Sequence, residues 1–340
     1  MLQNIEVSVY CLAYNHEKYI RKALEGFVNQ KTNFGYEVFV HDDASTDKTA
    51  KIIEEYATRY PDIIKPIYQT ENQYSKGVKI TTEIILPRMS GKYIAVCEGD
   101  DYWIDDCKLQ KQYDILESIP SVAICTHRVN CVTEDDTEKI GEIPGNWFNF
   151  KGDKEFTTDQ FSDFLMIRKR YAFHTSSYFA RREVFCSKER SLLSQKMNGD
   201  MAIMYASLLY GNVYFIDQEM SNRRMMTMGN YNQRKKAFPI EKKIAHDLNI
   251  IDGYILFDEL SKHEYRKKVL YCAYIDLITH SIITYPKQKE VKKYFKKFKK
   301  DNPFDWRISS KLNIAYVLFI FCPIVFRKIM LNKRKKASKK

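Results

Sequence analysis

The chain has 340 residues, of which 44% are apolar and 29% are charged. This length and composition allow a buried core in one large domain with an appendage or in two modest domains. They exclude global disorder. The formal net charge of +12 lies mostly near the C-terminus, because residues 287–300 hold eight lysines and one glutamate and residues 327–340 hold eight lysines or arginines and no acid. The basic balance therefore describes that end of the chain and not the whole surface.

The first 126 residues alternate strand-like and helix-like patterns. Apolar, β-rich runs predict strands over residues 5–12, 36–41, 64–69, 92–97 and 121–126. Helices are predicted over residues 17–30, over the stretch that an N-cap at Ser45-Thr46-Asp47 opens and Pro61 ends, and over residues 108–117. This alternation is typical of an α/β fold with a mostly parallel sheet flanked by helices, in which ligands bind at the carboxyl ends of the strands.

The pattern is weaker after residue 126. Residues 128–150 contain two glycines and a proline and predict loops or a hairpin, residues 173–180 and 213–217 predict strands, and residues 200–210 are apolar nearly all round, which is typical of a buried helix. Beyond about Asn222 the chain becomes polar and then helical as far as residue 300. We therefore expect the α/β domain to be followed by a helical C-terminal extension.

The eight cysteines form no C-x-x-C pair, which argues against a zinc ribbon or a thioredoxin-type site. Cys11 and Cys97 lie in apolar runs that predict core strands, and Met1-Leu2-Gln3-Asn4 leads directly into the first strand without a secretory leader. We therefore expect a cytoplasmic protein with reduced thiols.

Two acidic clusters follow two separate predicted strands. Asp42-Asp43 ends the second strand, and Glu98-Gly99-Asp100-Asp101 ends the fourth. Carboxylates gathered at one edge of a sheet repel one another unless a cation joins them, and Mg²⁺ or Mn²⁺ carrying a diphosphate would supply that charge. Gly99 would let the backbone approach such a ligand closely. Ordinary turn and cap residues are the alternative interpretation of each cluster.

No glycine-rich phosphate loop follows the first strand. Neither G-x-G-x-x-G nor G-x-x-x-x-G-K-[ST] is present there, so a dinucleotide site, a P-loop and a nucleotidyltransferase loop all lack their main support. The strand instead runs into Ala13-Tyr14-Asn15-His16-Glu17. A tyrosine at this place can stack on a base, and a tyrosine packed in the protein is the alternative.

Four segments in this order, SVYCLAYNHEKYIRKALEGFVNQ, YEVFVHDDASTDKTAKII, NQYSKG and GKYIAVCEGDDYW, resemble the family 2 glycosyltransferases of the GT-A fold that assemble bacterial polysaccharides and other glycans. The resemblance is close over about residues 5–130 and fades toward residue 225. It implies a GT-A domain over residues 1–225, with a nucleotide-binding half (1–130) and an acceptor half (131–225), then a helical extension (226–305) and an apolar helix with a basic tail (306–340).

The resemblance also implies roles for single residues on the donor side. Tyr14 matches the residue that packs on the nucleotide base, and Asp43 matches the carboxylate that accepts a hydrogen bond from uracil or a similar base. Asp100 and Asp101 match the motif that binds the diphosphate and a divalent metal, with Asp101 as the direct metal ligand. The expected cofactor is therefore Mg²⁺ or Mn²⁺.

On the acceptor side, the tract His174-Thr175-Ser176-Ser177 resembles the strand that lines the acceptor, and Asp200, at the start of a helix, matches the catalytic base of inverting members. The implied mechanism is a single displacement at the anomeric carbon, in which Asp200 takes the proton of the acceptor hydroxyl and the metal stabilises the departing diphosphate. An ordinary helix N-cap is the alternative interpretation of Asp200.

The sequence departs from the family pattern at two places. Leu12-Ala13 stands where many relatives have Pro-Thr, which removes a hydroxyl near the nucleotide. Relatives often carry Arg-x-His after the strand predicted over residues 213–217; here Arg224 fits the arginine, and Met226 stands in place of the histidine. Arg224, with Arg223 beside it, is expected to pair with phosphate, and solvated surface arginines are the alternative.

Residues 312–326 (LNIAYVLFIFCPIVF) form an apolar run that contains Pro323 and precedes the basic tail. The run is short for a membrane-spanning helix. Its position favours attachment to an anionic membrane surface over nucleic-acid binding, for which no folded module is visible; a helix packed on the α/β domain is the alternative. We expect a peripheral protein on the inner face of the plasma membrane and no nucleic-acid partner.

The sequence as a whole predicts an inverting, metal-dependent glycosyltransferase. It would move a sugar from a nucleoside-diphosphate sugar, with a UDP-sugar as the expected donor, to a glycan or lipid-linked acceptor in surface polysaccharide synthesis. The alternative from a different class is a non-catalytic module that binds a nucleotide sugar without turnover.

Overall fold

The structure is a computed structural model of the chain, and it describes residues 4–145, 148, 150–167, 173–225, 237–307 and 310–337. The chain forms two compact units. The first contains Met1–Phe161, Tyr171–Ser194 and Gly199–Arg234, and the second contains Ser162–Arg170, Gln195–Asn198 and Lys235–Lys340.

The first unit is built on a sheet with the strand order β3-β2-β1-β4-β9-β6-β10-β5, to which β7 adds beside β6 and β8 beside β10. Its strands are β1 (Ile5–Ala13), β2 (Gly35–Asp42), β3 (Ile64–Tyr68), β4 (Tyr93–Val96), β5 (Tyr102–Trp103), β6 (Val122–Val132), β7 (Lys139–Ile143), β8 (Lys154–Phe156), β9 (Phe179–Arg181) and β10 (Asn212–Arg224). β3, β2, β1 and β4 run parallel, and β6 runs parallel to β10. β9 joins these two parts with antiparallel pairing to β4 and β6. The predicted α/β class is confirmed.

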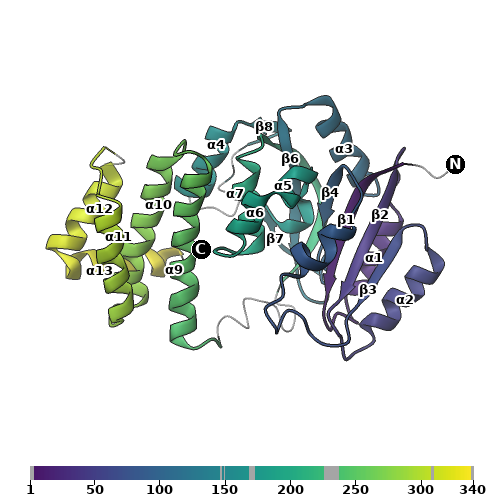
Figure 1. Cartoon of the computed structure of the whole chain (residues 1–340), viewed down its shortest axis with the longest axis horizontal. Coiled ribbons are helices and arrows are strands. Elements are labelled where there is room, and N and C mark those ends of the chain that lie inside the picture. The colour runs from purple at the N-terminus through teal and green to yellow at the C-terminus, as the bar shows by residue number, and fades with distance from the viewer. Residues whose placement is uncertain are drawn as a thin grey trace. The chain divides into compact units, whose positions relative to one another are not determined.

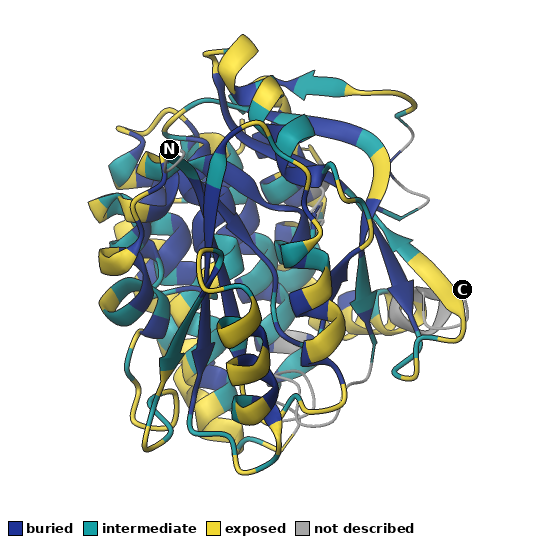
Figure 2. Cartoon of the chain, turned by 90° about the vertical axis from the view of Figure 1, so that its right-hand side faces the viewer, coloured by how far each residue is buried: buried dark blue, intermediate teal, exposed yellow. Residues whose placement is uncertain are grey.

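Helices cover this sheet. They are α1 (Ile20–Val28), α2 (Thr49–Arg59), α3 (Lys108–Ser118), α4 (Thr158–Ser162), α5 (Arg182–Cys186), α6 (Lys188–Leu193) and α7 (Gly199–Ser207), with short turns at η1 (Ile80–Ile85), η2 (Leu86–Arg88) and η4 (Thr175–Ser177). β1, β2 and β4 are buried along almost their whole length, and Figure 2 shows the strands in dark blue among helices that are yellow on their outward faces. Burial on both faces explains why these strands are continuous apolar runs.

The structure differs from the sequence prediction at some element ends. α2 begins at Thr49, and Lys48 at its N-cap position makes no side-chain cap bond. Within the predicted cap tract, the Asp47 carboxylate accepts the N–H of Thr49 over 2.9 Å, whereas the Ser45 hydroxyl donates to Asp42. Only the end of the strand predicted over residues 173–180 is a strand, because Thr175–Ser177 forms a 3₁₀ turn that His174 caps. β10 extends to Arg224 because it pairs with β6 beyond its apolar part.

The second unit consists mainly of helices, which Figure 1 shows in green to yellow. They are η3 (Asp163–Ile167), α9 (Ile240–Leu260), α10 (Arg266–Thr279), η5 (His280–Thr284), α11 (Lys289–Asp301), α12 (Ser310–Phe321) and α13 (Pro323–Ala337). The predicted helical extension is confirmed. The apolar run is divided between α12 and α13, because Pro323 lacks the N–H that a continuous helix needs and suits the first position of a new one. Among the helices that the structure describes, none has both the length and the apolar composition needed to cross a bilayer.

Candidate active site

The carboxyl ends of β1, β2 and β4 meet at one edge of the sheet, because these three strands are parallel neighbours. Hydrogen bonds join the loops that follow β1 and β2. The Asn15 N–H donates to Ser45 Oγ over 2.9 Å, and the Thr46 N–H donates to Asn15 Oδ1 over 2.8 Å. Tyr14 stands on this fixed loop with 41% of its surface exposed, so its ring is available to a ligand.

Asp43 continues β2 into the same edge and is 4% exposed. Its N–H donates to Ala13 O over 3.0 Å. Its two carboxylate oxygens accept the backbone N–H groups of Gln73 (2.8 Å) and Tyr74 (3.1 Å). The carboxylate therefore fixes the loop after β3, and each oxygen keeps a second lone pair with which it can accept a further donor.

The acidic residues after β4 form a cluster. Glu98, Asp100 and Asp101 each offer a carboxylate oxygen, and these oxygens all lie within 4.8 Å of one another. Desolvation and then the charge of Asp100 raise the pKa of Glu98 to about 7, and the same causes raise the pKa of Asp101 well above its usual value. The three carboxylates are a set of hard oxygen donors that fits Mg²⁺ or Mn²⁺.

Gly99 lies inside this cluster, where it packs closely against the protein. Its N–H donates to Leu12 O over 2.9 Å, and a Cβ at this position would lie 2.9 Å from both His16 Nδ1 and Ile20 Cδ1. The small residue therefore lets the loop after β4 approach the loop after β1.

Arg224 ties β10 to the acidic loop. Its N–H donates to Asp101 Oδ1 over 2.9 Å, and its Nη1 donates to the backbone oxygen of Asp100 over 2.7 Å. The guanidinium carbon lies 4.6 Å from the ring centre of Tyr102 and 5.4 Å from that of Tyr19, and the residue is only 6% exposed. These contacts make Arg224 a support for the acidic loop.

Arg223 is the preceding residue, and its side chain points to the other face of the strand. Its charge lowers the pKa values of Glu98 and Asp101, although desolvation and the charge of Asp100 raise them by more. Within the part of the chain that the structure describes, its guanidinium has neither a hydrogen-bond nor an ion-pair partner. Both arginines were expected to pair with phosphate, and these expectations stay predictions. Met226 lies outside the described residues.

The His174–Ser177 tract also reaches the acidic cluster. His174 Nδ1 lies 3.7 Å from Asp101 Oδ2, and burial, followed by the charge of Arg223, lowers the pKa of His174 well below its usual value, so the ring is neutral. Trp103 Nε1 donates to Ser176 O over 3.0 Å, and this bond fixes the turn at Thr175–Ser177. Trp103 was not predicted as a site residue, although it directly follows the Asp-Asp-Tyr motif.

Asp200 lies in the first turn of α7, so the predicted helix start is confirmed. One of its carboxylate oxygens accepts the N–H of Met201 over 2.7 Å, and the side chain remains partly exposed. The charge of Asp200, after desolvation and the charge of Asp100, adds to the rise in the pKa of Glu98, so the two carboxylates lie within electrostatic range of each other. The role of Asp200 as a base stays a prediction.

Comparisons with known proteins agree with this arrangement. Residues 8–185 match the family described as glycosyl transferase family 2. An uncharacterized protein of Mycobacterium tuberculosis is 43% identical over 141 residues, which is 42% of this chain and 40% of that protein. The putative teichuronic acid biosynthesis glycosyltransferase TuaG of Bacillus subtilis is 32% identical over 110 residues, which is 32% of this chain and 41% of that protein. The matches thus span less than half the length of these relatives.

The fold is also similar to solved structures. Staphylococcus aureus TarS superposes with a TM-score of 0.63 at 14% identity, covering 95% of this chain and 55% of that one. Its fragment 1–349 in complex with UDP gives a TM-score of 0.60 at 15% identity, covering 98% of this chain and 92% of the fragment. At this identity the likeness shows a shared fold, and it confirms the expected GT-A-type architecture.

Proposed function

We propose, because the chain belongs to glycosyltransferase family 2, that it transfers a sugar from a nucleoside-diphosphate sugar to a glycan or lipid-linked acceptor. The observation that carries the proposal is the group of three carboxylates after β4 with the guanidinium of Arg223 in the same electrostatic environment. A diphosphate with a divalent cation complements both charges. TarS binds UDP, which supports a UDP-sugar as the donor, and the name of TuaG supports a role in surface polysaccharide synthesis.

The donor side follows from the loops after β1, β2 and β4. The exposed ring of Tyr14 packs on the base, and the remaining lone pairs of Asp43 accept a donor group of the base. Asp101 and Asp100 would hold Mg²⁺ or Mn²⁺, and a cation bound there would supply positive charge to a diphosphate. Arg223 contacts a diphosphate oxygen, whereas Arg224 keeps Asp100 and Asp101 in place through its bonds to their loop.

The acceptor side is built around Asp200. An oxygen of the acceptor hydroxyl attacks the anomeric carbon while the bond from that carbon to the diphosphate breaks, so the configuration inverts. The hydroxyl proton passes to the carboxylate of Asp200, which lies in the first turn of α7. The neutral ring of His174 adds no positive charge beside Asp101 and so does not compete with the cation.

The test uses two active-site variants and a matched control. We expect Asp101→Asn and Asp200→Asn each to lower sugar transfer by about 100-fold or more, measured over a panel of nucleoside-diphosphate sugars with Mg²⁺ or Mn²⁺. Asp106→Asn makes the same chemical change at an exposed residue whose ion pair with Lys31 spans 3.2 Å, and we expect it to keep wild-type activity.

Binding separates the two function classes. If the wild-type chain binds UDP in a metal-dependent way by calorimetry but consumes no donor sugar, the non-catalytic module is the correct class. If both active-site variants transfer sugar at the wild-type rate, the assigned mechanism is wrong.

We also propose peripheral attachment to the cytoplasmic face of the membrane through α12 and α13. Ile314, Phe321 and Ile324 expose 62%, 76% and 74% of their surface, and α13 continues into the basic C-terminal residues. Exposed apolar side chains beside basic residues are the composition of an interfacial helix.

A further inference from the structure

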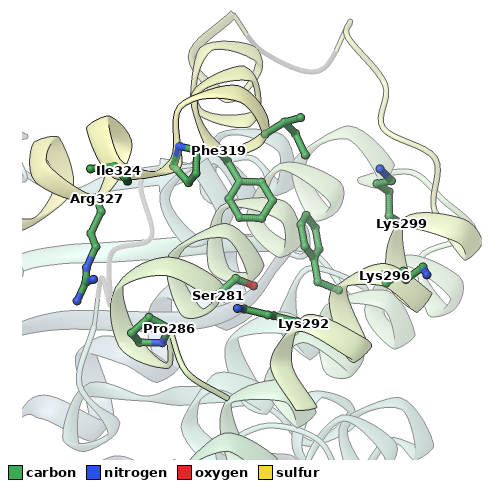
Figure 3. Close-up of a pocket in the computed structure, with 11 residues that line it drawn as sticks. Ser281, Pro286, Lys292, Lys296, Lys299, Phe319, Ile324 and Arg327 are labelled. Carbon is green, nitrogen blue, oxygen red and sulfur yellow. The ribbon is translucent and has the colours of Figure 1, made fainter. Parts of the chain in front are cut away.

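The helical unit contains a pocket of about 500 Å³ between η5, α11, α12 and α13. Six of its eleven lining residues are apolar, four are basic, one is Ser281, and none is acidic. Phe295 from α11 and Phe319, Ile320 and Ile324 from α12 and α13 form the apolar wall. Figure 3 shows Phe319 and Ser281 turned toward the same space, with labelled basic residues around it.

The basic residues form one rim. Lys292, Lys296 and Lys299 are spaced by four and three residues, so they share one face of α11, and Arg327 comes from α13. Among the described residues, none of these four side chains has an ion-pair or hydrogen-bond partner. Four cations without an acid repel one another, so an anion is the complementary ligand.

Ser281 gives a second observation that does not depend on charge. The residue is 4% exposed, and its hydroxyl oxygen has no hydrogen-bond partner within the described residues. A buried hydroxyl without a partner is costly. Because Ser281 lines the pocket, an oxygen of a bound ligand would satisfy it.

The pocket also opens onto the apolar surface of α12 and α13. Ile320 and Ile324 line the pocket and still expose 43% and 74% of their surface. Inorganic phosphate would complement the four cations but would leave the apolar wall exposed to water. A neutral hydrocarbon would cover the apolar wall but would leave the cations without an anion. A ligand with an anionic phosphate joined to an apolar chain satisfies both.

We propose that this pocket binds one phosphate-bearing membrane lipid. Its apolar chain packs on Phe295 and Phe319, and its phosphate lies among Lys296, Lys299 and Arg327, with Ser281 donating to a lipid oxygen. This inference deepens the proposed membrane attachment. The two can fail separately, because a protein can attach to vesicles through exposed side chains without taking a single lipid into a pocket.

The experiment uses the full chain and dihexanoyl-phosphatidylglycerol below its micelle concentration, followed by calorimetry and thermal shift. We expect Lys296→Glu with Lys299→Glu to weaken binding by about tenfold or more. The matched control is Lys293→Glu with Lys297→Glu, which makes the same charge change at exposed lysines of α11 that do not line the pocket. We expect this control to stay within about twofold of the wild type.

A second pair of variants tests the apolar wall. Ile320→Trp fills the pocket and should abolish lipid binding, whereas Ile314→Trp, on α12 outside the pocket, should leave lipid binding unchanged.

Equal losses of lipid binding in the two lysine pairs would mean general electrostatic attraction and would overturn the proposal. Equal binding of inorganic phosphate, or of dihexanoyl-phosphatidylcholine, would overturn it as well, because the first needs no chain and the second has no net charge. Self-association with no lipid binding would identify the pocket as an interface between copies.

Discussion

Arg223 and Arg224 are neighbours in sequence, yet their guanidinium groups meet different surroundings. Arg224 is enclosed by two tyrosine rings and bonded to the backbone of Asp100. Arg223 has no such partner among the described residues, and its charge acts on the pKa of Glu98. The first arrangement supports the fold, and the second leaves a cation for a ligand.

This contrast predicts that the two arginines respond differently to the same substitution. Arg224→Gln removes a buried, bonded charge and should lower the free energy of unfolding by roughly 2–4 kcal/mol. Arg223→Gln should leave stability nearly unchanged and raise the KM for the donor by about tenfold. Urea denaturation and steady-state kinetics measure the two effects. An unchanged donor KM in Arg223→Gln would refute its contact with the diphosphate.

Lys108 on α3 gives a prediction about pH. Its side chain is fully buried, its Nζ donates to Gln112 Oε1 over 2.7 Å, and it lies 4.1 Å from the ring centre of Trp103. Burial lowers the pKa of Lys108 to about 7. The unfolded chain holds this proton up to a pH of about 10.4, so between about pH 7 and pH 10 the unfolded state binds more protons, and this group makes stability rise with pH.

Lys108→Met should therefore stabilise the protein at pH 7, by roughly 1–2 kcal/mol, and flatten the rise of stability toward pH 10. Thermal denaturation at several pH values measures both effects. Lys51→Met, at an exposed lysine of α2, is the control, and it should keep the wild-type slope. If Lys108→Met keeps that slope too, Lys108 is not the titrating group.

At the scale of elements, α3 supports the turn that carries His174. Gln112 Nε2 donates to Cys125 O on β6 over 3.0 Å and to Ser177 O in the η4 turn over 2.9 Å. One buried amide therefore bridges a strand and the turn beside the acidic cluster. Together with the bond from Trp103 to Ser176, it sets the position of this side of the site.

Gln112→Leu tests this bridge. The change leaves two buried carbonyl oxygens without donors and the Lys108 amine without its acceptor, so we expect the free energy of unfolding to fall by roughly 2–4 kcal/mol. Gln110→Leu, at a partly exposed position two residues earlier on α3, should cost less than about 1 kcal/mol. Urea denaturation compares them. Equal losses in the two variants would mean that the bridge adds nothing to an ordinary Gln→Leu change.

The same elements show how far sequence alone leads. The alternation of apolar runs predicted the parallel strands, which end at one edge of the sheet. The acids after the fourth predicted strand form the cluster at Asp100 and Asp101, whereas Asp43, after the second, accepts two backbone N–H groups. The turn at Thr175–Ser177 was predicted as strand, since its shape depends on contacts with Trp103 and Gln112 that lie far away in sequence. Propensity patterns carry no information on such contacts.

At the scale of the whole molecule, the two units do not follow the order of the chain. η3 belongs to the second unit, and the Lys268 ammonium of α10 donates to Ser162 Oγ over 2.7 Å and pairs with Asp163 over 2.9 Å. The partners of these two polar contacts lie about a hundred residues apart in the sequence, so no local sequence pattern predicts the contacts. The extension was predicted as a continuous C-terminal stretch because helical periodicity is a local signal.

The helical unit leads to a prediction about the membrane. Phe321 on α12 is 76% exposed and does not line the pocket, so Phe321→Glu removes apolar surface and adds a negative charge without altering the lipid site. Ile140→Glu makes a similar change at a 54% exposed residue of β7. We expect Phe321→Glu to weaken sedimentation with phosphatidylglycerol-containing vesicles by about tenfold, and Ile140→Glu to leave it unchanged. Both should still bind soluble dihexanoyl-phosphatidylglycerol, because the pocket residues are intact. Vesicle binding that survives Phe321→Glu would show that α12 does not form the attachment surface.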